Sequence, residues 1–145
     1  MDIAFTVSLP VDTSSVPFVR GLCRMALEHL RVEPAVVDEI VLALTEACAN
    51  VVQHAGDHTD YEVQVAIDDA VCRIVVVDGG EGLDPDELTS AATADRSPLE
   101  RGHGLRLMQA LVDRLSFRHD PDGRHRVTLE KRLAAPPALR LVDPV

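Results

Sequence analysis

The chain has 145 residues, 46% of them hydrophobic, which suits one globular domain with a sizeable core. Its formal net charge of -10 argues against a nucleic-acid binder, because phosphate contacts need clustered Lys and Arg. An acidic chain can have a basic protein partner, although acidity often serves only solubility. No apolar stretch is long enough to span a bilayer, and no basic N-terminal segment precedes an apolar run. We therefore expect a cytoplasmic protein without membrane contact.

The cysteines are Cys23, Cys48 and Cys72, an odd number without Cys-x-x-Cys spacing. Each lies among apolar neighbours. This pattern predicts buried free thiols in a reducing compartment.

The first part of the chain alternates a strand and two helices. Residues 3–9 alternate apolar and polar side chains, which predicts a strand with one buried face. Ser14 or Ser15 can cap a helix over residues 16–30. A second helix, residues 34–56, begins at a proline and ends at a glycine. Both helices have apolar residues at helical spacing.

Two strands follow, at residues 61–67 and 71–77. The second is nearly all apolar, so we expect it at the centre of the sheet. Residues 83–101 mix Asp, Pro, Ser, Thr and Ala with little periodicity, and a loop of this length is usually functional or mobile. Apolar periodicity then predicts a helix over residues 105–115.

Two closing strands are predicted around Phe117 and over residues 127–133, joined by a hairpin turn at residues 121–123. The Ala- and Pro-rich sequence that follows indicates that the fold has ended. We expect a single domain over residues 1–134 and a short tail over residues 135–145. Antiparallel strands with helices on one face make this an α+β two-layer sandwich with a mostly antiparallel sheet.

The first candidate cluster for function lies late in the second helix. Glu46 and Asn50 are four residues apart and share a helix face, which His54 continues. An Asn carbonyl oxygen is a reasonable Mg²⁺ ligand, and a carboxylate one turn away can accept a hydroxyl proton. The alternative is an ordinary polar helix surface.

The second cluster ends the apolar strand. Asp78 could accept a hydrogen bond from an exocyclic amine such as that of adenine. Gly80 and Gly82 would let the backbone approach a ligand closely. The alternative is a hairpin turn, and Asp122-Gly123 is an example of such a turn between two strands.

The third cluster is Gly102-His103-Gly104, expected to open the helix that starts at residue 105. Free N–H groups at a helix start can bind phosphate, and Arg101 could reach a terminal phosphate. The segment 83–101 would then act as a lid over a nucleotide. A glycine-flanked helix start is also a common structural device.

The sequence gives less support to other kinds of functional site. His54 and His58 have no acidic partner at a spacing that zinc requires. The chain contains neither a P-loop motif nor a Gly-x-Ser-x-Gly nucleophile elbow.

The order of the three clusters resembles that of the GHKL (Bergerat-fold) ATPases and kinases, and in particular their stand-alone branch, the bacterial anti-sigma-factor serine kinases. The resemblance covers roughly Ile3 to Leu133. It implies that Asn50 is a Mg²⁺ ligand and that Glu46 is the general base for a substrate serine. It also implies that Asp78 reads the adenine amine.

The remaining motif positions match as well. Gly80 and Gly82 complete the Asp-x-Gly-x-Gly motif, and Gly102 and Gly104 form the Gly-x-Gly motif. Arg101 resembles the basic residue that contacts phosphate or partner. The chain departs from the pattern in having a third glycine at position 79 and His103 between the later glycines, and His103 is grouped with the nucleotide-binding residues without an assigned role.

The resemblance implies an ATP- and Mg²⁺-dependent protein serine/threonine kinase, a homodimer, which binds a sigma factor and phosphorylates a STAS-type anti-anti-sigma protein. Two alternatives stay open. The chain could be an ATP-binding sensor that sequesters a partner without catalysis, or a detached catalytic domain of a histidine kinase.

Overall fold

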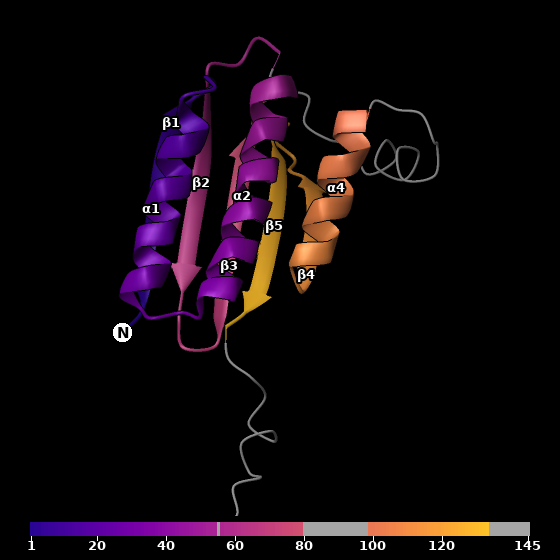
Figure 1. Cartoon of the computed structure of the whole chain (residues 1–145). Coiled ribbons are helices and arrows are strands. Elements are labelled where there is room, and N and C mark those ends of the chain that lie inside the picture. Colours follow the sequence, from indigo (N-terminus) through magenta and orange to yellow (C-terminus); the bar gives the residue numbers. More distant parts are fainter. Residues whose placement is uncertain (55, 80–98, 134–145) are drawn as a thin grey trace, which may run out of the picture.

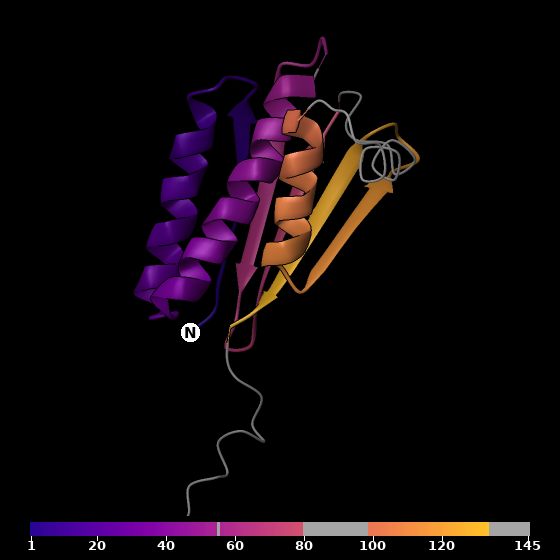
Figure 2. The ribbon, with the colours of Figure 1, turned by 45° about the vertical axis from the view of Figure 1, so that its right-hand side comes forward.

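The computed structural model describes residues 1–54, 56–79 and 99–133, with the backbone alone for residues 99–103. Within this part, a five-stranded antiparallel sheet has the order β1-β2-β3-β5-β4. The helices α1, α2 and α4 cover one face of the sheet (Figures 1 and 2). This confirms the predicted α+β two-layer sandwich. In chain order the elements are β1 (Ile3–Pro10), α1 (Ser15–His29), α2 (Pro34–His54), β2 (Asp60–Ile67), β3 (Val71–Asp78), α4 (Leu99–Leu111), β4 (Arg114–His119) and β5 (His125–Arg132).

The strand β3 lies at the centre of the sheet, as its apolar sequence predicts. It pairs with β2 on one side and with β5 on the other. All its residues from Ile74 to Asp78 are buried, including Val75 and Val77, whose side chains face away from the helices. Strand β1, at the edge, instead buries only alternate side chains on one face, as predicted.

The helix α2 supplies the largest part of the core. Its apolar stripe faces the sheet, and the helix ends at His54, just before Gly56, which has a φ of 65°. Each fully buried Val, Leu or Ile contributes about 1.5–3 kcal/mol. The buried residues of the helix are Val37, Ile40, Val41, Ala43, Leu44, Ala47, Cys48 and Val51.

The predicted serine cap of α1 is wrong. Ser14 occupies the N-cap position, but its side chain makes no capping hydrogen bond. Instead, its backbone N–H donates to Asp12 Oδ1 at 3.0 Å, and the Ser15 hydroxyl donates to the backbone carbonyl of Asp12 at 2.8 Å. Both serines therefore donate to Asp12 in the turn before the helix, and neither side chain caps the helix.

The helix α4 begins and ends earlier than predicted. Its first residue is Leu99 rather than residue 105, and its last is Leu111 rather than residue 115, because β4 begins at Arg114. The lid expected over residues 83–101 lies mostly outside the described residues, as does the predicted tail.

The closing hairpin has the predicted turn. Gly123 has a φ of 91°, and its N–H donates to the backbone carbonyl of Asp120 at 2.9 Å. The Asp122 carboxylate accepts from the N–H of Arg124 at 3.1 Å. Asp122-Gly123 is thus a structural turn, as expected.

The cysteines Cys23, Cys48 and Cys72 are free and buried, as predicted. Burial raises the pKa of the Cys48 thiol to about 12, although a hydrogen bond with Tyr61 offsets part of this effect. Burial also raises the pKa of the Tyr61 phenol to about 12, and its oxygen lies 2.7 Å from Ser15 Oγ. In the described part of the chain, no helix is both long and apolar enough to cross a bilayer.

These pKa values predict a loss of stability in alkaline solution. The ordinary pKa values are 9.0 for the thiol and 10.0 for the phenol, so the unfolded chain releases these protons first as the pH rises. The free energy of unfolding should be undiminished below about pH 9 and fall between about pH 9 and 12. Urea denaturation at about pH 8 and about pH 10 measures this, and Cys48→Ala should show a shallower decline. Equal stability at both pH values would contradict the assignment.

Candidate functional site

Glu46 and Asn50 lie one turn apart on α2, the helix that runs between α1 and α4 in Figure 1. Both side chains are half-buried, whereas their neighbours Ala47 and Val51 face the core. The helical period therefore puts the two polar residues at the border of the apolar stripe. His54 continues the row by one more turn and is also half-buried, as the sequence predicted.

Gly104 brings α4 into direct contact with this polar pair. It is buried, and a β-carbon built on it would lie 2.9 Å from Glu46 Oε2 and 4.0 Å from Asn50 Oδ1. Real β-carbons do not come as close to another atom as 2.9 Å. The absence of a side chain at Gly104 is therefore what lets the Glu46 carboxylate lie against α4.

Asp78 is the last residue of β3 and is only 3% exposed. It is two residues beyond Val76 and four beyond Ile74, so it shares their side of the strand, which places its carboxylate on the side of the sheet that the helices cover. Burying a carboxylate costs free energy unless hydrogen bonds or opposite charges compensate for the lost hydration. Buried carboxylates are therefore often found at functional sites.

One cavity connects Asp78 with Asn50. It is open to solvent on one side, and its empty space is about 420 Å³ when the solvent at its mouth is counted. Its walls are mostly apolar, which suits a flat heteroaromatic ring with a few polar groups to orient it. Besides Asn50 and Asp78, the lining comprises Ala47, Val51, Val76, Met108, Phe117, Arg118, His125, Arg126 and Val127.

The sequence identified the α2 and β3 sides of this cavity but missed its far wall. Met108, Phe117 and Val127 were expected only as core or strand residues, and His125 was not singled out. His125 is the cross-strand partner of Asp78. That pairing joins β3 to the last strand of the chain, and short-range patterns do not reveal such pairings.

His58 was also missed. A β-carbon on Gly79 would lie 2.9 Å from His58 Nδ1 and 3.1 Å from its Cε1. The third glycine of the second cluster, Gly79, thus makes room for the imidazole beside the end of β3.

The structure describes the other predicted site residues only in part. Gly80 and Gly82 lie outside the described residues. Arg101, Gly102 and His103 belong to α4, with only their backbone described.

The prediction that Gly102-His103-Gly104 opens α4 is wrong. Leu99 and Glu100 come first, and the glycines lie inside the helix. Residues such as Leu, Glu and Arg favour helix strongly enough to extend it ahead of two glycines. Gly102 is the fourth residue of α4 and closes its first turn, whereas Gly104 lies beyond that turn.

The residues present fit a nucleotide with Mg²⁺. The apolar walls suit a base, and the Asp78 carboxylate can accept from an exocyclic amine. The buried Nδ2 of Asn50 has no hydrogen-bond partner among the described residues, so this amide has bonding capacity left for a ligand. No cluster of His, Cys, Asp or Glu in the described ranges could form a metal cage. Mg²⁺ usually takes few protein ligands and completes its shell with phosphates and water, and Asn50 Oδ1 is an oxygen of the kind it binds.

Comparisons with known proteins agree with this fold. Residues 9–131 match the histidine kinase-like ATPase domain family. No protein of curated function matches the chain in sequence.

Two solved structures share the fold. The RsbU and RsbW domains of Rv1364c from Mycobacterium tuberculosis align with a TM-score of 0.69 and 24% identity over 92% of this chain and 33% of theirs. This chain thus spans about one third of the length of that protein chain. The SiaB–SiaC complex from Pseudomonas aeruginosa gives a TM-score of 0.59 and 16% identity over 88% of this chain and 89% of that one.

The motifs at Glu46, Asn50 and Asp78 lie within the matched segment, which covers most of the chain and confirms the resemblance to the GHKL ATPases and kinases. The chain belongs to the histidine kinase-like ATPase domain family.

Proposed function

We propose that this protein is an ATP- and Mg²⁺-dependent protein serine/threonine kinase that acts as an anti-sigma regulator. One observation carries this proposal: the Glu46 carboxylate and the Asn50 amide meet at Gly104, beside the cavity that contains Asp78. A purely sequestering sensor would bind ATP there but would have no need of the carboxylate.

The partners follow from the kind of protein that this chain is similar to. One similar structure contains an RsbW domain together with an RsbU domain, and the other is a complex of SiaB with SiaC. We propose a sigma factor as the inhibited partner and a STAS-type anti-anti-sigma protein as the phosphorylated one, with the kinase as a homodimer.

Glu46 acts on the substrate in this proposal. Its carboxylate accepts the proton of the serine hydroxyl as the hydroxyl oxygen bonds to the γ-phosphorus of ATP, while the bond from that phosphorus to the bridging oxygen breaks and ADP leaves. In a loose transition state the proton moves late, so a carboxylate within reach of the hydroxyl can accept it. Packing against Gly104 limits where this carboxylate can move, which positions it for the hydroxyl.

Asn50 and Asp78 hold the two ends of the nucleotide. Asp78 accepts from the adenine amine while the apolar walls of the cavity exclude water. Asn50 Oδ1 is the proposed ligand for Mg²⁺, which, when bound, neutralises charge on the phosphates. Arg101, Gly102 and His103 are proposed to face the phosphates from the first turns of α4.

We expect Glu46→Gln to lower phosphate transfer to a purified STAS-type partner by about 10²–10⁴-fold, because the amide cannot accept the proton. The ATP dissociation constant should change little, since the side chain keeps its shape. Radiolabel incorporation and calorimetric titration measure the two effects. Loss of ATP binding in this variant would instead make Glu46 a structural residue.

The same labelled product separates the alternatives. A phosphoserine or phosphothreonine ester survives acid, whereas phosphohistidine does not. An acid-labile product would favour a detached histidine-kinase domain, and ATP binding without any labelled partner would favour the sensor.

Asn50→Ala should abolish the Mg²⁺-dependent part of ATP binding. Calorimetric titration with ATP, with and without Mg²⁺, measures it. Gln53→Ala is the matched control, because Gln53 is exposed on the same helix. Wild-type affinity in Asn50→Ala would remove this residue from the site, and no ATP binding by the wild type would overturn the proposed function.

Gly104→Ala should impair transfer without unfolding the protein. The new methyl group would push away the end of the Glu46 side chain, which can rotate, so stability should change by no more than about 1 kcal/mol. Transfer should fall by at least about tenfold. Gly21→Ala on α1 is the control, since nothing lies within 4 Å of the added atom. Equal activity of the two variants would contradict the proposed role of the Gly104 contact.

A further inference from the structure

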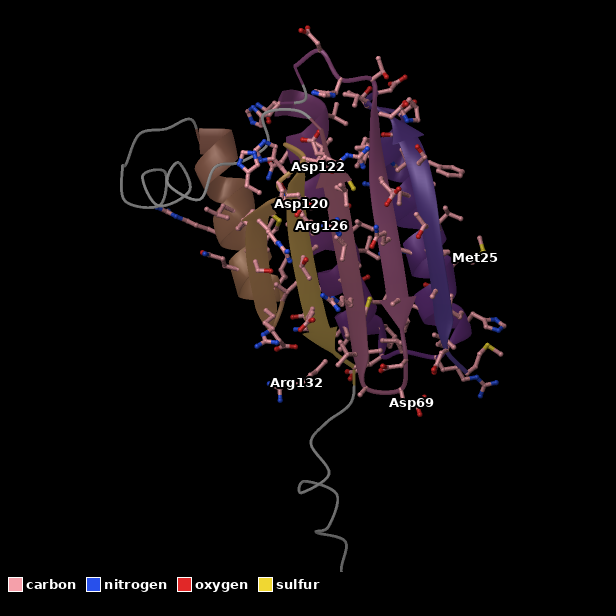
Figure 3. The ribbon with its side chains drawn as sticks, turned by 180° about the vertical axis from the view of Figure 1, so that it is seen from behind. Met25, Asp69, Asp120, Asp122, Arg126 and Arg132 are labelled. Carbon is pink, nitrogen blue, oxygen red and sulfur yellow. The ribbon has the colours of Figure 1, made fainter. Side chains whose placement is uncertain are left out.

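The open face of the sheet, opposite the helices, carries a group of arginines on β3, β5 and β4. On each strand they alternate with residues that face the helices, so they share one side of the sheet. We call this surface the arginine face. It is visible from behind in Figure 3, where Arg126 and Arg132 are labelled along β5. Its arginines are Arg73, Arg114, Arg118, Arg126 and Arg132.

Strand register brings these side chains together in rows. Glu130 of β5 is paired with Arg73 of β3 on one side and with Arg114 of β4 on the other. Four residues farther toward the hairpin, Arg126 is paired with Arg118. Residues distant in sequence thus form one continuous surface.

The Glu130 carboxylate lies between two guanidinium groups. Its Oε2 is 3.5 Å from Arg73 Nε, and its Oε1 is 3.6 Å from Arg114 Nη1. The Arg side chains are 58% and 80% exposed, against 26% for Glu130. The carboxylate is therefore shielded while both cations face solvent.

Asp120, in the turn that follows β4, likewise lies between two guanidinium groups, beside the first residues of β5. Its Oδ1 is 3.6 Å from Arg118 Nε, and its Oδ2 accepts from Arg126 Nη2 at 3.1 Å and from Arg126 Nε at 3.3 Å. Asp120 is 13% exposed, and Arg118 is 72% exposed. Each carboxylate thus holds two arginines, and each guanidinium keeps N–H donors for another acceptor.

These ion pairs are a poor explanation of fold stability, because exposed ion pairs contribute little to the free energy of unfolding. They do fix the directions of flexible side chains before any ligand arrives, which lowers the entropy cost of binding. Five arginines on this face meet the carboxylates of Glu130, Asp120 and Asp113, the last of which accepts from the backbone N–H of Arg132 at 2.6 Å. Positive charge is therefore in excess on this face, in a chain whose net charge is -10.

The spacing indicates a macromolecular ligand. Glu130 and Arg126 are four residues apart on β5, so the two clusters are separated by about 13 Å. A single small anion cannot reach both, but carboxylates spread over a protein surface can. Guanidinium groups pair well with carboxylates, often through two hydrogen bonds.

Nucleic acid fits less well. The aromatic rings of Phe117, His119 and His125 alternate with the arginines and lie on the opposite side of these strands. Within the described residues, the arginine face therefore offers no ring on which a base could stack. A long polyanion would also extend beyond this local patch onto an otherwise acidic protein.

We propose that the arginine face binds an acidic surface of a partner protein. The contact lies on the opposite side of the sheet from α2 and α4, and it does not depend on the proposed kinase activity. The bound protein would lie against β3, β5 and β4 and would leave the helical layer free.

The test uses a fluorescein-labelled decaglutamate peptide as the probe, with fluorescence anisotropy as the readout. The Arg73→Gln/Arg114→Gln double variant removes two charges away from the nucleotide cavity. The Arg20→Gln/Arg31→Gln double variant changes the net charge equally, from α1 and the turn after it. Thermal denaturation of all three proteins verifies that the variants are folded.

We expect the peptide to bind the wild type at low ionic strength and to bind the Arg73/Arg114 variant about tenfold more weakly. The Arg20/Arg31 variant should match the wild type. Three results would overturn the proposal: no peptide binding by the wild type, equal loss in both variants, or tighter binding of a ten-nucleotide oligothymidylate than of the peptide.

Discussion

The packing of α2 against the middle of the sheet is the contact on which the other features depend. The apolar stripe of this helix covers β3, the central strand of the sheet, and both Asp78 and Asn50 are fixed by that contact. Each fully buried Val, Leu or Ile at this interface contributes about 1.5–3 kcal/mol. The total can offset the several kcal/mol that a buried carboxylate such as Asp78 costs.

Glycines in this protein serve close packing at least as much as flexibility. Gly104 lets α4 approach the Glu46 carboxylate, and Gly79 accommodates the His58 ring beside the end of β3. Both contacts adjoin residues of the candidate nucleotide site. A site assembled this way is positioned by helix and strand packing, which holds side chains more accurately than loops do.

The two faces of the sheet have different chemistry. The helix-covered face is apolar and encloses the cavity that ends at Asp78. The open face carries arginines held by Glu130 and Asp120. The same strands form both faces, because successive side chains of a strand point to opposite sides of the sheet. Arg126 and Val127, for example, are neighbours in sequence and face opposite sides. One sheet can therefore support a nucleotide site and a separate protein-binding surface.

The sequence by itself determined the order of the helices and strands and the central position of β3. It also determined that Glu46 and Asn50 share a helix face and that Asp78 ends a buried strand. These features follow from local periodicity and from short motifs, which depend on neighbours within one or two turns. The buried cysteines and the Asp122-Gly123 turn were predictable for the same reason.

Only the tertiary structure decided the contacts between distant segments. Strand order and register place His125 beside Asp78 and assemble the arginine face, and helix packing places Gly104 against Glu46. The start of α4 and the hydrogen bonds before α1 were predicted wrongly, because helix propensity and turn hydrogen bonds competed with the expected glycine and serine signals. Such outcomes depend on how competing interactions add up over whole helices and strands, and a short sequence pattern does not contain that information.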